Sequence, residues 1–506
     1  MRPFAIDRLA TDVFDVVIVG GGIVGAGTAE LAARHGLSVA LVERGDFASG
    51  TSSASSKLIH GGLRYLRIGD LRLVREARRE VALLSGVVAP HIVQPMQFVL
   101  PIYQGGPYGK LPIWLALTLY GRIAGNGAGR PRLVDSGEAR RRAPSLRSDG
   151  LRGAGLYADA QTDDARLCLL NLRAAADAGA TVVNRAEVLG LDSSGGRVVA
   201  AQVHDAVGGE TFSVRGRTFV NATGPWVDGL RRLEDPHAGT SVVLSKGSHL
   251  VVDGVGNRHA AVTIPIDQDR VSFAIPWHGM LLLGTTDAPF FGNAEEVEVT
   301  EADEQQILSE ASFALAGLEL CEVRFRFAGL RVLPTGAATT TTRREVTLSR
   351  GSRGMLSIAG GKLTTYRCIA ISVLERLRVE LGLSRIDRAA YPLPGAAAPE
   401  AVAAALVRRH RALAPEAANH LAHVYGSLSD EVIGATEDVP NALEPLASGA
   451  PELVGQAVYA YRREWACDVE DVLRRRTTLA IRGLDSPDLR CRIETLAHRN
   501  AAKAHR

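Results

Sequence analysis

The sequence has few cysteines and no long apolar segment. Its five cysteines are far apart in the chain, and no CxxC pair occurs. This argues against a disulfide framework, a zinc ribbon and an iron–sulfur cluster, and we expect a reducing compartment. No stretch reaches the ~20 apolar residues of a membrane-spanning helix. The N-terminal segment MRPFAIDRLATDVFD lacks the apolar core of an export signal.

Neither sign of charge dominates the sequence. Lys and Arg together number 58 and Asp and Glu 55, which gives a net charge of +3. Because this excess is small, we expect no nucleic-acid partner. The basic residues are mostly arginine, whose planar side chain suits phosphate or carboxylate. Apolar residues make up 46% of the 506, as is typical of globular domains, and this length allows about two to four of them.

A glycine-rich turn lies between two predicted strands near the N-terminus. The run FDVVIV reads as a buried parallel strand, and Gly20, Gly22 and Gly25 form a GxGxxG motif directly after it. These glycines allow a tight turn, close approach to a pyrophosphate and close helix packing. Glu43 ends the second strand, SVALVE, where an acid can accept hydrogen bonds from a ribose. The unit predicts dinucleotide binding without distinguishing FAD from NAD.

Two later turns favour FAD. In FVNATGPW a strand runs into a small-residue turn where backbone can approach a cofactor. In IAGGKLTTYR a second glycine turn opens a helix, whose N-terminus can stabilise negative charge on a reduced flavin. Two turns that return to one cofactor suit the long FAD molecule better than NAD. The candidate residues of these turns are Ala222, Gly224, Gly361, Lys362, Leu363 and Thr364.

Eight motifs follow one another in a characteristic order. They are TSSASSKLIHGGLRYL, DDARL, VNATGPWV, KGSH, IPW, GTTD, GLR and GGKLTTYR. This series resembles the FAD-dependent glycerol-3-phosphate dehydrogenases of the membrane-associated respiratory type. The resemblance covers about residues 12 to 390, and VYGS and EWACDVEDVLRRRT extend it more weakly into the C-terminal part.

The resemblance implies an α/β fold of three parts. The first is a glucose-oxidase-like, Rossmann-type FAD-binding domain made of residues 12–75, 150–235 and 335–390. The second is an inserted substrate domain with a mixed β-sheet, made of residues 76–149 and 236–334. Residues 391–400 are the predicted linker, and residues 401–506 the all-α C-terminal cap domain.

The resemblance also implies the reaction. Glycerol 3-phosphate would lose a hydride from C2 to N5 of FAD and become dihydroxyacetone phosphate, and the electrons would pass to membrane quinone. The alternatives are an oxidase that uses oxygen, an amine or amino-acid oxidase on the same scaffold, and a flavoprotein without catalysis. We expect a cytoplasmic protein bound peripherally to the inner face of the cell membrane, with a homodimer as one candidate assembly.

The substrate is a dianion, so its pocket needs cations. The candidates are Arg64, Arg331, Arg344 and Lys362, and the resemblance puts all four in the family's substrate pocket. The adjacent Arg343 is the alternative to Arg344. We also expect Tyr65 at the border of the pocket. An amine oxidase would instead carry one arginine in an apolar pocket.

The alcohol proton needs an acceptor, and His249 in KGSH is the first candidate. His60 in LIHGG is the second, and an alkoxide beside Arg331 can also lose its proton to water. The predicted catalytic set is therefore His249, Arg331 and Lys362.

The serine-rich loop and a pair of acids have plainer interpretations. No GxSxG motif occurs, so the serines are not predicted nucleophiles. The resemblance makes Ser52, Ser53 and Ser56 hydrogen-bond donors to the flavin and pyrophosphate. Asp163 and Asp164 lack a neighbouring His or Cys, and we predict no metal site.

The segment PYGKLPIWLALTLYGRIAG (107–125) has an apolar middle that is too short to span a membrane. We expect a helix lying in the membrane interface, with a buried core helix as the alternative. A second helix is predicted over residues 70–84, with Asp70 as its N-cap. We expect the arginine side of this helix to face solvent, and the arginine-rich stretch of residues 64–79 is a candidate for contact with anionic lipid headgroups.

Overall fold

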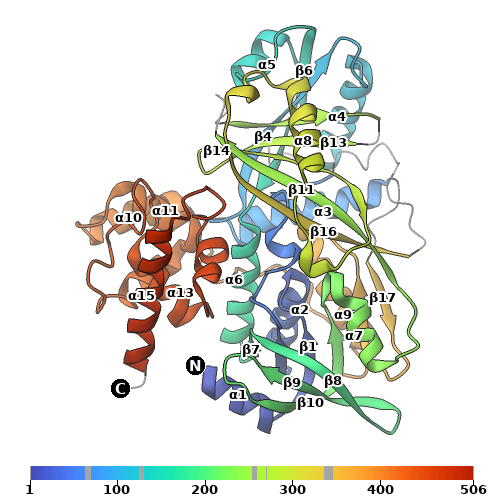
Figure 1. Cartoon of the computed structure of the whole chain (residues 1–506). Coiled ribbons are helices and arrows are strands. Elements are labelled where there is room, and N and C mark those ends of the chain that lie inside the picture. The colour runs from blue at the N-terminus through green and yellow to red at the C-terminus, as the bar shows by residue number, and fades with distance from the viewer. Residues whose placement is uncertain are drawn as a thin grey trace.

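The computed structural model describes residues 2–62, 70–124, 130–253, 259–268, 270–335 and 346–504. In these residues two β-sheets lie one above the other, and a group of helices lies beside them (Figure 1). The fold is the predicted α/β arrangement with two mixed sheets and a helical C-terminal domain.

The first sheet carries the predicted dinucleotide-binding unit. Its path runs β17-β18-β10-β1-β2-β7, and β8 and β9 extend it from β10. The pairs β18-β10, β10-β1, β1-β2 and β2-β7 are parallel. Its described strands are β1 (Val13–Val19), β2 (Val39–Val42), β7 (Thr181–Val183), β8 (Ala186–Ser194), β9 (Arg197–Asp205), β10 (Thr211–Asn221), β17 (Thr347–Arg350) and β18 (Leu356–Ala359).

The second sheet follows the path β15-β11-β14-β13-β12-β4-β6-β3, and β16 and β5 pair with β11 and β6. Its described strands are β3 (Leu58–Ile59), β4 (Gln94–Tyr103), β5 (Arg132–Val134), β6 (Leu151–Gln161), β11 (Val242–Asp253), β12 (Ala260–Pro265), β13 (Val271–Trp277), β14 (Met280–Gly284), β15 (Ala288–Phe290) and β16 (Val323–Pro334).

Two strands differ from the predicted domain boundaries. Residues 12–75 and 150–235 were assigned to the FAD-binding domain, yet β3 and β6 within them belong to the second sheet. The reason is long-range pairing, because β6 runs antiparallel to β4 from Gln94↔Gln161 to Tyr103↔Leu151 and also binds β3. The chain thus enters the second sheet early, which brings the loop before β3 to the boundary between the sheets.

Helices and short turns cover both sheets. The longer helices of this part are α1 (Arg2–Thr11), α2 (Ile23–Arg34), α3 (Leu71–Leu83), α4 (Lys110–Ala124), α5 (Ser136–Arg142), α6 (Asp164–Asp177), α7 (Val227–Glu234), α8 (Glu301–Ala314) and α9 (Tyr366–Leu377). The short ones are η1 (Thr51–Ser53), η3 (Leu84–Val88), η4 (Gly224–Trp226), η5 (Ala294–Glu296), η6 (Leu318–Leu320) and η7 (Leu363–Thr365). The predicted N-cap of α3 is confirmed, since the Asp70 side chain accepts a hydrogen bond from the backbone N–H of Leu73.

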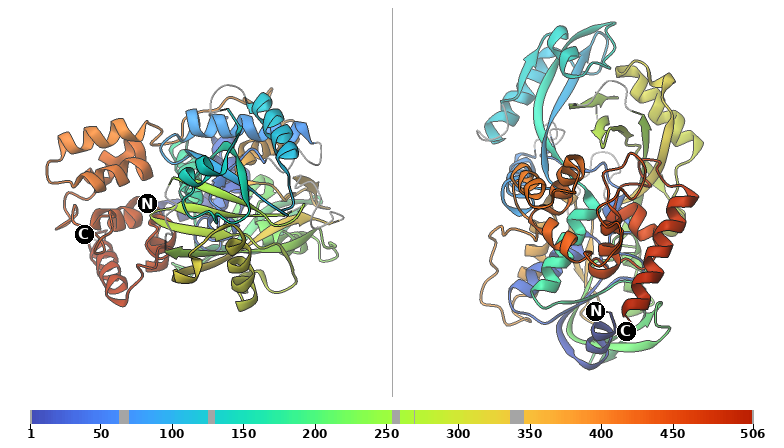
Figure 2. Two further views of the ribbon diagram at one scale, coloured as in Figure 1. Left: turned by 90° about the horizontal axis from the view of Figure 1, so that it is seen from above. Right: turned by 90° about the vertical axis from the view of Figure 1, so that its left-hand side faces the viewer.

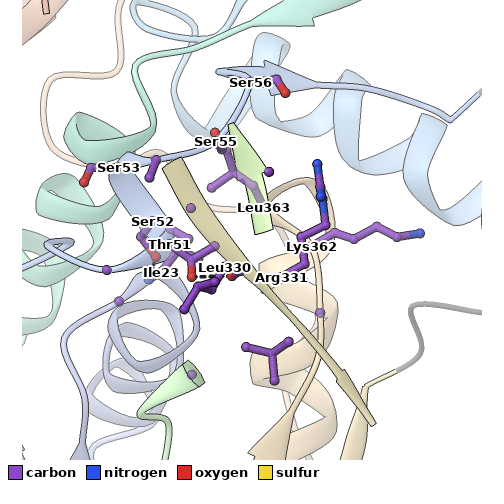
Figure 3. A pocket seen from close by; sticks show the side chains of 18 of the residues that line it. Ile23, Thr51, Ser52, Ser53, Ser55, Ser56, Leu330, Arg331, Lys362 and Leu363 are labelled. Carbon is purple, nitrogen blue, oxygen red and sulfur yellow. Dashed lines mark hydrogen bonds between the residues drawn. The ribbon is translucent and has the colours of Figure 1, made fainter. Parts of the chain in front are cut away.

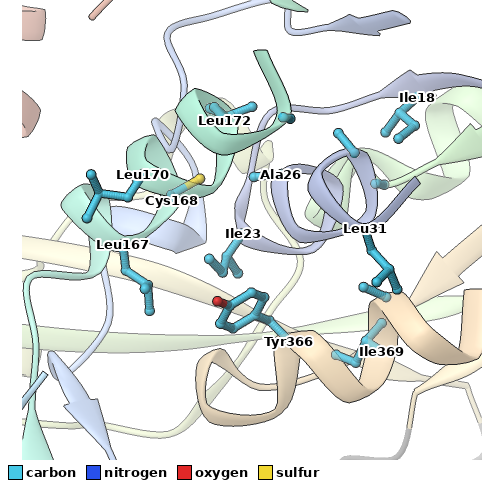
Figure 4. Packing of buried hydrophobic residues seen from close by; sticks show 14 of the residues in the cluster. Ile18, Ile23, Ala26, Leu31, Leu167, Cys168, Leu170, Leu172, Tyr366 and Ile369 are labelled. Atoms are coloured by element: carbon cyan, nitrogen blue, oxygen red, sulfur yellow. The ribbon is translucent and has the colours of Figure 1, made fainter. Parts of the chain in front are cut away.

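Helix α2 packs between α6 and α9 and so fixes the glycine turn that precedes it (Figure 4). Tyr366 of α9 is fully buried against α2. A Cβ at Gly27 would lie 2.6 Å from the Tyr366 ring, so only glycine admits this contact. Burial of such a ring contributes about 1.5–3 kcal/mol, which helps to anchor α2.

The C-terminal part is helical and forms a separate group at one side of the molecule (Figure 2). Its described helices are α10 (Pro399–Arg409), α11 (Pro415–Tyr425), η8 (Gly426–Leu428), α12 (Ser429–Gly434), α13 (Val454–Arg463), α14 (Val469–Asp471), η9 (Val472–Arg476) and α15 (Pro487–Ala504). This group contacts the FAD-binding part through η9, which packs on α6.

Candidate active site

A cavity of about 1370 Å³ lies between the two sheets and is lined by most of the predicted site residues. Figure 3 shows the serine-rich loop, Arg331 and Lys362 around it. The predicted residues that line it are Gly20, Gly22, Glu43, Ser52, Ser53, Ser56, His60, Ala222, Gly224, His249, Arg331, Gly361, Lys362, Leu363 and Thr364. The structure therefore brings together residues that are more than 300 positions apart in the sequence.

The GxGxxG turn has the geometry that a dinucleotide requires. Gly20 has φ +112°, and a Cβ there would lie 2.5 Å from the carbonyl oxygen of Ala222. A Cβ at Gly25 would lie 2.0 Å from the carbonyl oxygen of Gly20. Gly22 is the N-cap of α2 and has no side chain to cap it. The N-terminus of α2 consequently opens onto the cavity, where its partial positive charge favours a phosphate.

Glu43 and the serine-rich loop close around this turn. Glu43 accepts hydrogen bonds from the backbone N–H groups of Gly21 and Gly45, each at 2.7 Å. Burial raises the pKa of Glu43, and these two backbone donors oppose the shift. The backbone N–H of Ile23 donates to Ser52 Oγ at 2.9 Å, which holds the loop against the start of α2.

The two late turns form the far wall of the cavity. Gly224 has φ +58° and Gly361 has φ +107°, so both turns use backbone conformations that favour glycine. The indole Nε1 of Trp226 is buried and makes no hydrogen bond in the described residues. The backbone N–H of His60 donates to Thr364 Oγ1 at 3.2 Å, which joins the HGG turn to the second of these turns.

These features fit FAD. The cavity is bordered by the N-terminus of α2, by Glu43 beside it and by turns whose glycines carry no side chain. The N–H groups at the start of α2 would hold the pyrophosphate, and Glu43 would accept hydrogen bonds from the ribose. Bound FAD would supply a two-electron acceptor to the adjoining part of the cavity.

Arg331 lies on β16 with its guanidinium fixed from two sides. It donates to Thr285 Oγ1 at 2.8 Å and forms an ion pair with Asp287 at 3.3 Å. A Cβ at Gly247 would lie 2.5 Å from Arg331 Nη2, so the glycine of KGSH leaves space for this side chain. Asp287 of GTTD was not among the predicted site residues, although it holds the arginine in place.

His249 lies on β11 and contacts Ser56, since its Nε2 and Ser56 Oγ are 2.9 Å apart. Its ring stacks on Phe327 with 4.8 Å between the ring centroids. Burial, together with the cations Arg331 and Lys57, lowers the pKa of His249 to about 3. The ring is therefore neutral at physiological pH. Ser56, predicted as a donor to flavin or pyrophosphate, is thus also the hydrogen-bond partner of His249.

Lys57 was not among the predicted site residues. It is fully buried, and its Nζ lies 2.6 Å from Asp164 Oδ1. The hydroxyl and backbone N–H of Ser55 also donate to Asp164, and Asp163 caps α6. The two acids of DDARL therefore have structural roles: Asp164 holds the serine-rich loop, and Asp163 caps α6. The predicted pocket residues Arg64, Tyr65 and Arg344, and the alternative Arg343, lie outside the described residues.

The C-terminal helices contribute to the cavity through η9. Arg474 and Arg475 line it, and Arg475 and Arg476 both form ion pairs with buried Asp46. Although burial opposes the effect, these arginines lower the pKa of Asp46. Asp46 lies three residues after Glu43, so the C-terminal domain holds the loop that carries the predicted ribose ligand.

Helix α4 exposes one apolar stripe and buries the other face. The exposed fractions are 65% for Leu111, 48% for Trp114 and 55% for Leu115, whereas Tyr120 is fully buried. No described helix has both the length and the apolar character needed to cross a membrane. In α3 the predicted outward orientation is wrong for Arg78, which is buried because it pairs with Asp159 at 3.0 Å.

Comparisons with known proteins agree with this architecture. The family model "FAD dependent oxidoreductase" matches residues 15–367, and "C-terminal domain of alpha-glycerophosphate oxidase" matches residues 388–488. The chain is 36% identical to glycerol-3-phosphate dehydrogenase 2 of Mycobacterium tuberculosis, over 96% of this chain and 85% of that protein. It is 37% identical to aerobic glycerol-3-phosphate dehydrogenase of Staphylococcus epidermidis, over 73% and 68%.

Solved structures give the same result. The glycerol-3-phosphate dehydrogenase of Bacillus halodurans, complexed with FAD, has a TM-score of 0.78 and 27% identity and covers 99% of this chain and 97% of its own. The L-alpha-glycerophosphate oxidase of Mycoplasma pneumoniae, with FAD bound, shares the fold with a TM-score of 0.58 and 18% identity, and the match covers 76% of this chain and 100% of its own.

The fold and the dinucleotide site define an FAD-dependent oxidoreductase. Within this class, the chain belongs to the family of FAD-dependent glycerol-3-phosphate dehydrogenases and oxidases. FAD is the cofactor, as predicted from the two late turns and the resemblance.

Proposed function

We propose that the protein oxidises sn-glycerol 3-phosphate to dihydroxyacetone phosphate and passes the electrons to membrane quinone. The observation that carries the proposal is the position of Arg331, His249 and Lys362 in the same cavity as the dinucleotide turn. A site for a carboxylate substrate needs one cation, whereas two in one cavity suit a phosphate dianion. The names of the relatives support the same substrate.

In this proposal the chain's residues bind the dianion and handle one proton. Arg331 and Lys362 attract the phosphate, and Arg331 also stabilises the negative charge that develops on the C2 oxygen. His249 accepts the hydroxyl proton as the hydride leaves C2, when that proton is most acidic. The low pKa leaves the ring unprotonated before the reaction, although it also makes the ring a weak base. Ser56 bonds to Nε2 of His249 and so fixes the orientation of the ring.

Two features support quinone as the acceptor and a peripheral site on the inner face of the cell membrane. Helix α4 presents Leu111, Trp114, Leu115 and Leu119 to solvent. Such a stripe suits a helix that lies in the membrane interface. Leu115 and Leu119 also line the cavity, so the cavity reaches this surface. An acceptor dissolved in lipid can enter there.

The test is an anaerobic half-reaction with the purified protein in mild detergent. Addition of glycerol 3-phosphate should bleach the flavin band, whereas glycerol and sarcosine should not. Recolouring should then be much faster with menadione than with dissolved oxygen. Faster recolouring with oxygen would indicate the oxidase reaction of the family, and failure to bleach would overturn the substrate.

A further inference from the structure

A buried carboxyl group that has no role assigned so far lines the cavity. Asp159, near the end of β6, is 5% exposed and lines the cavity. Its Oδ1 accepts three hydrogen bonds, from the Gly61 backbone N–H at 2.9 Å, Arg78 Nη1 at 3.0 Å and Tyr120 OH at 2.8 Å. In the described part of the chain, no group donates to its Oδ2. One oxygen is thus held in place and the other is left for a ligand.

The surroundings of this carboxyl group leave it able to exchange a proton. Burial raises the pKa of Asp159 to about 6, although Gly61, Arg78 and Tyr120 act in the opposite direction. Among the residues that the structure describes, the charged and titratable groups near it are Arg78 from α3, Tyr120 from α4 and Tyr157 from its own strand. A carboxyl group with such a pKa is protonated part of the time near neutral pH, as a proton donor must be.

The cavity beside Asp159 is apolar and leads to α4. Its lining there includes Phe98 and Leu100 of β4, Ile113 and Leu117 of α4, and Phe273 of β13. Tyr120 connects Asp159 to α4, because it belongs to α4 and its hydroxyl donates a hydrogen bond to Asp159. The exposed Leu115 and Leu119 line the outer part of this region. We call this region, from Asp159 to Leu119, the α4 arm.

We propose that the α4 arm receives the quinone and that Asp159 gives a proton to a quinone carbonyl oxygen as the quinone is reduced. This inference rests on the proposed function. Oxidation of the alcohol releases two electrons and two protons, and reduction of a quinone to the hydroquinone consumes the same number. The O–H bond of Asp159 breaks as an O–H bond of the hydroquinone forms. The second proton of the hydroquinone comes from the medium. The Asp159 carboxylate, stabilised by Arg78 and Tyr120, also regains its proton from the medium.

The test separates electron transfer from proton transfer. Holoenzyme is reduced with dithionite, which makes the experiment independent of the substrate, and is reoxidised with menadione or with ferricyanide, which takes electrons without protons. Asp159→Asn should slow the reaction with menadione about 100-fold, within the range for loss of a general acid, and leave the reaction with ferricyanide unchanged. Asp149→Asn, at an exposed carboxylate of the same sheet region, is the matched control and should match the parent with both acceptors.

A second variant covers the case in which Asp159→Asn does not fold. The Tyr120 hydroxyl favours the charged form of Asp159, so Tyr120→Phe should raise the pKa of Asp159. In the parent, the rate with menadione should fall as pH rises through about 6, and in Tyr120→Phe this fall should move to higher pH. The infrared C=O band of a protonated carboxyl group should titrate over the same range and move with it.

Three results would overturn the proposal. They are an equal loss of rate with both acceptors in Asp159→Asn, a pH profile that Tyr120→Phe leaves in place, and a carboxyl band that does not titrate near pH 6. Bleaching by glycerol 3-phosphate is measured separately, so a wrong substrate and a wrong proton donor give different results.

Discussion

Replacement of Gly25 by alanine tests the geometry of the dinucleotide turn. The new Cβ would lie 2.0 Å from the carbonyl oxygen of Gly20, a backbone atom, and contacts of this kind are not found below 3.0 Å. Helix α2 must therefore move away from Gly20, and its first N–H groups must leave the position that suits a pyrophosphate. Overpacking of this kind costs about 1–3 kcal/mol. If this cost raises the free energy of the FAD complex and not that of the apoprotein, the affinity for FAD falls roughly 5- to 150-fold.

The assay is the dissociation constant of FAD, measured by reconstituting the apoprotein and following flavin fluorescence. Gly434→Ala is the control, because a Cβ at Gly434 at the end of α12 meets nothing within 4 Å. It should leave FAD affinity unchanged. If Gly25→Ala binds FAD as tightly as the parent protein, the turn does not hold the pyrophosphate as described.

Three further predictions concern charged groups. Arg331→Lys loses the planar fork, which should cost about 1.5–3 kcal/mol of substrate binding and raise the KM for glycerol 3-phosphate at least tenfold in steady-state assays; an unchanged KM would contradict the role of Arg331. Asp46→Asn leaves Arg475 and Arg476 buried without their carboxylate. Urea unfolding of the apoprotein should show a free energy of unfolding lower by about 3–5 kcal/mol. A decrease below about 1 kcal/mol would refute a stabilising role of these buried ion pairs. Because the pKa of His249 is about 3, flavin reduction should show no inflection between roughly pH 5 and 8 from this residue, and an inflection near pH 6.5 that disappears in His249→Asn would contradict its burial.

The cofactor site could be predicted because its signals are local. The spacing of Gly20, Gly22 and Gly25 between two strands defines the first turn. The two later turns, in FVNATGPW and IAGGKLTTYR, are recognisable from their small residues. The cations were found because the resemblance marks their motifs. In the structure, Arg331 and Lys362 line the same cavity as the glycine turn.

The remaining features depend on contacts that sequence spacing does not encode. Asp46 and Arg476 are 430 residues apart and meet only after the C-terminal helices dock. Asp159 lies in a strand, and its sequence position does not distinguish it from an ordinary polar strand residue. Its proposed role depends on Arg78 of α3 and Tyr120 of α4. The residues of β6 were predicted to lie in the FAD-binding domain, yet β6 pairs within the second sheet, because pairing partners are set by tertiary structure.

The most direct test of the account is an anaerobic titration of the bound flavin with sn-glycerol 3-phosphate, with dihydroxyacetone phosphate measured in the same samples. The account predicts full bleaching with one product molecule formed per flavin, none with glycerol, and weak bleaching in Arg331→Lys at the same concentration. A flavin that stays oxidised at millimolar glycerol 3-phosphate would contradict it, and the cations of the cavity would then have to bind a different anion.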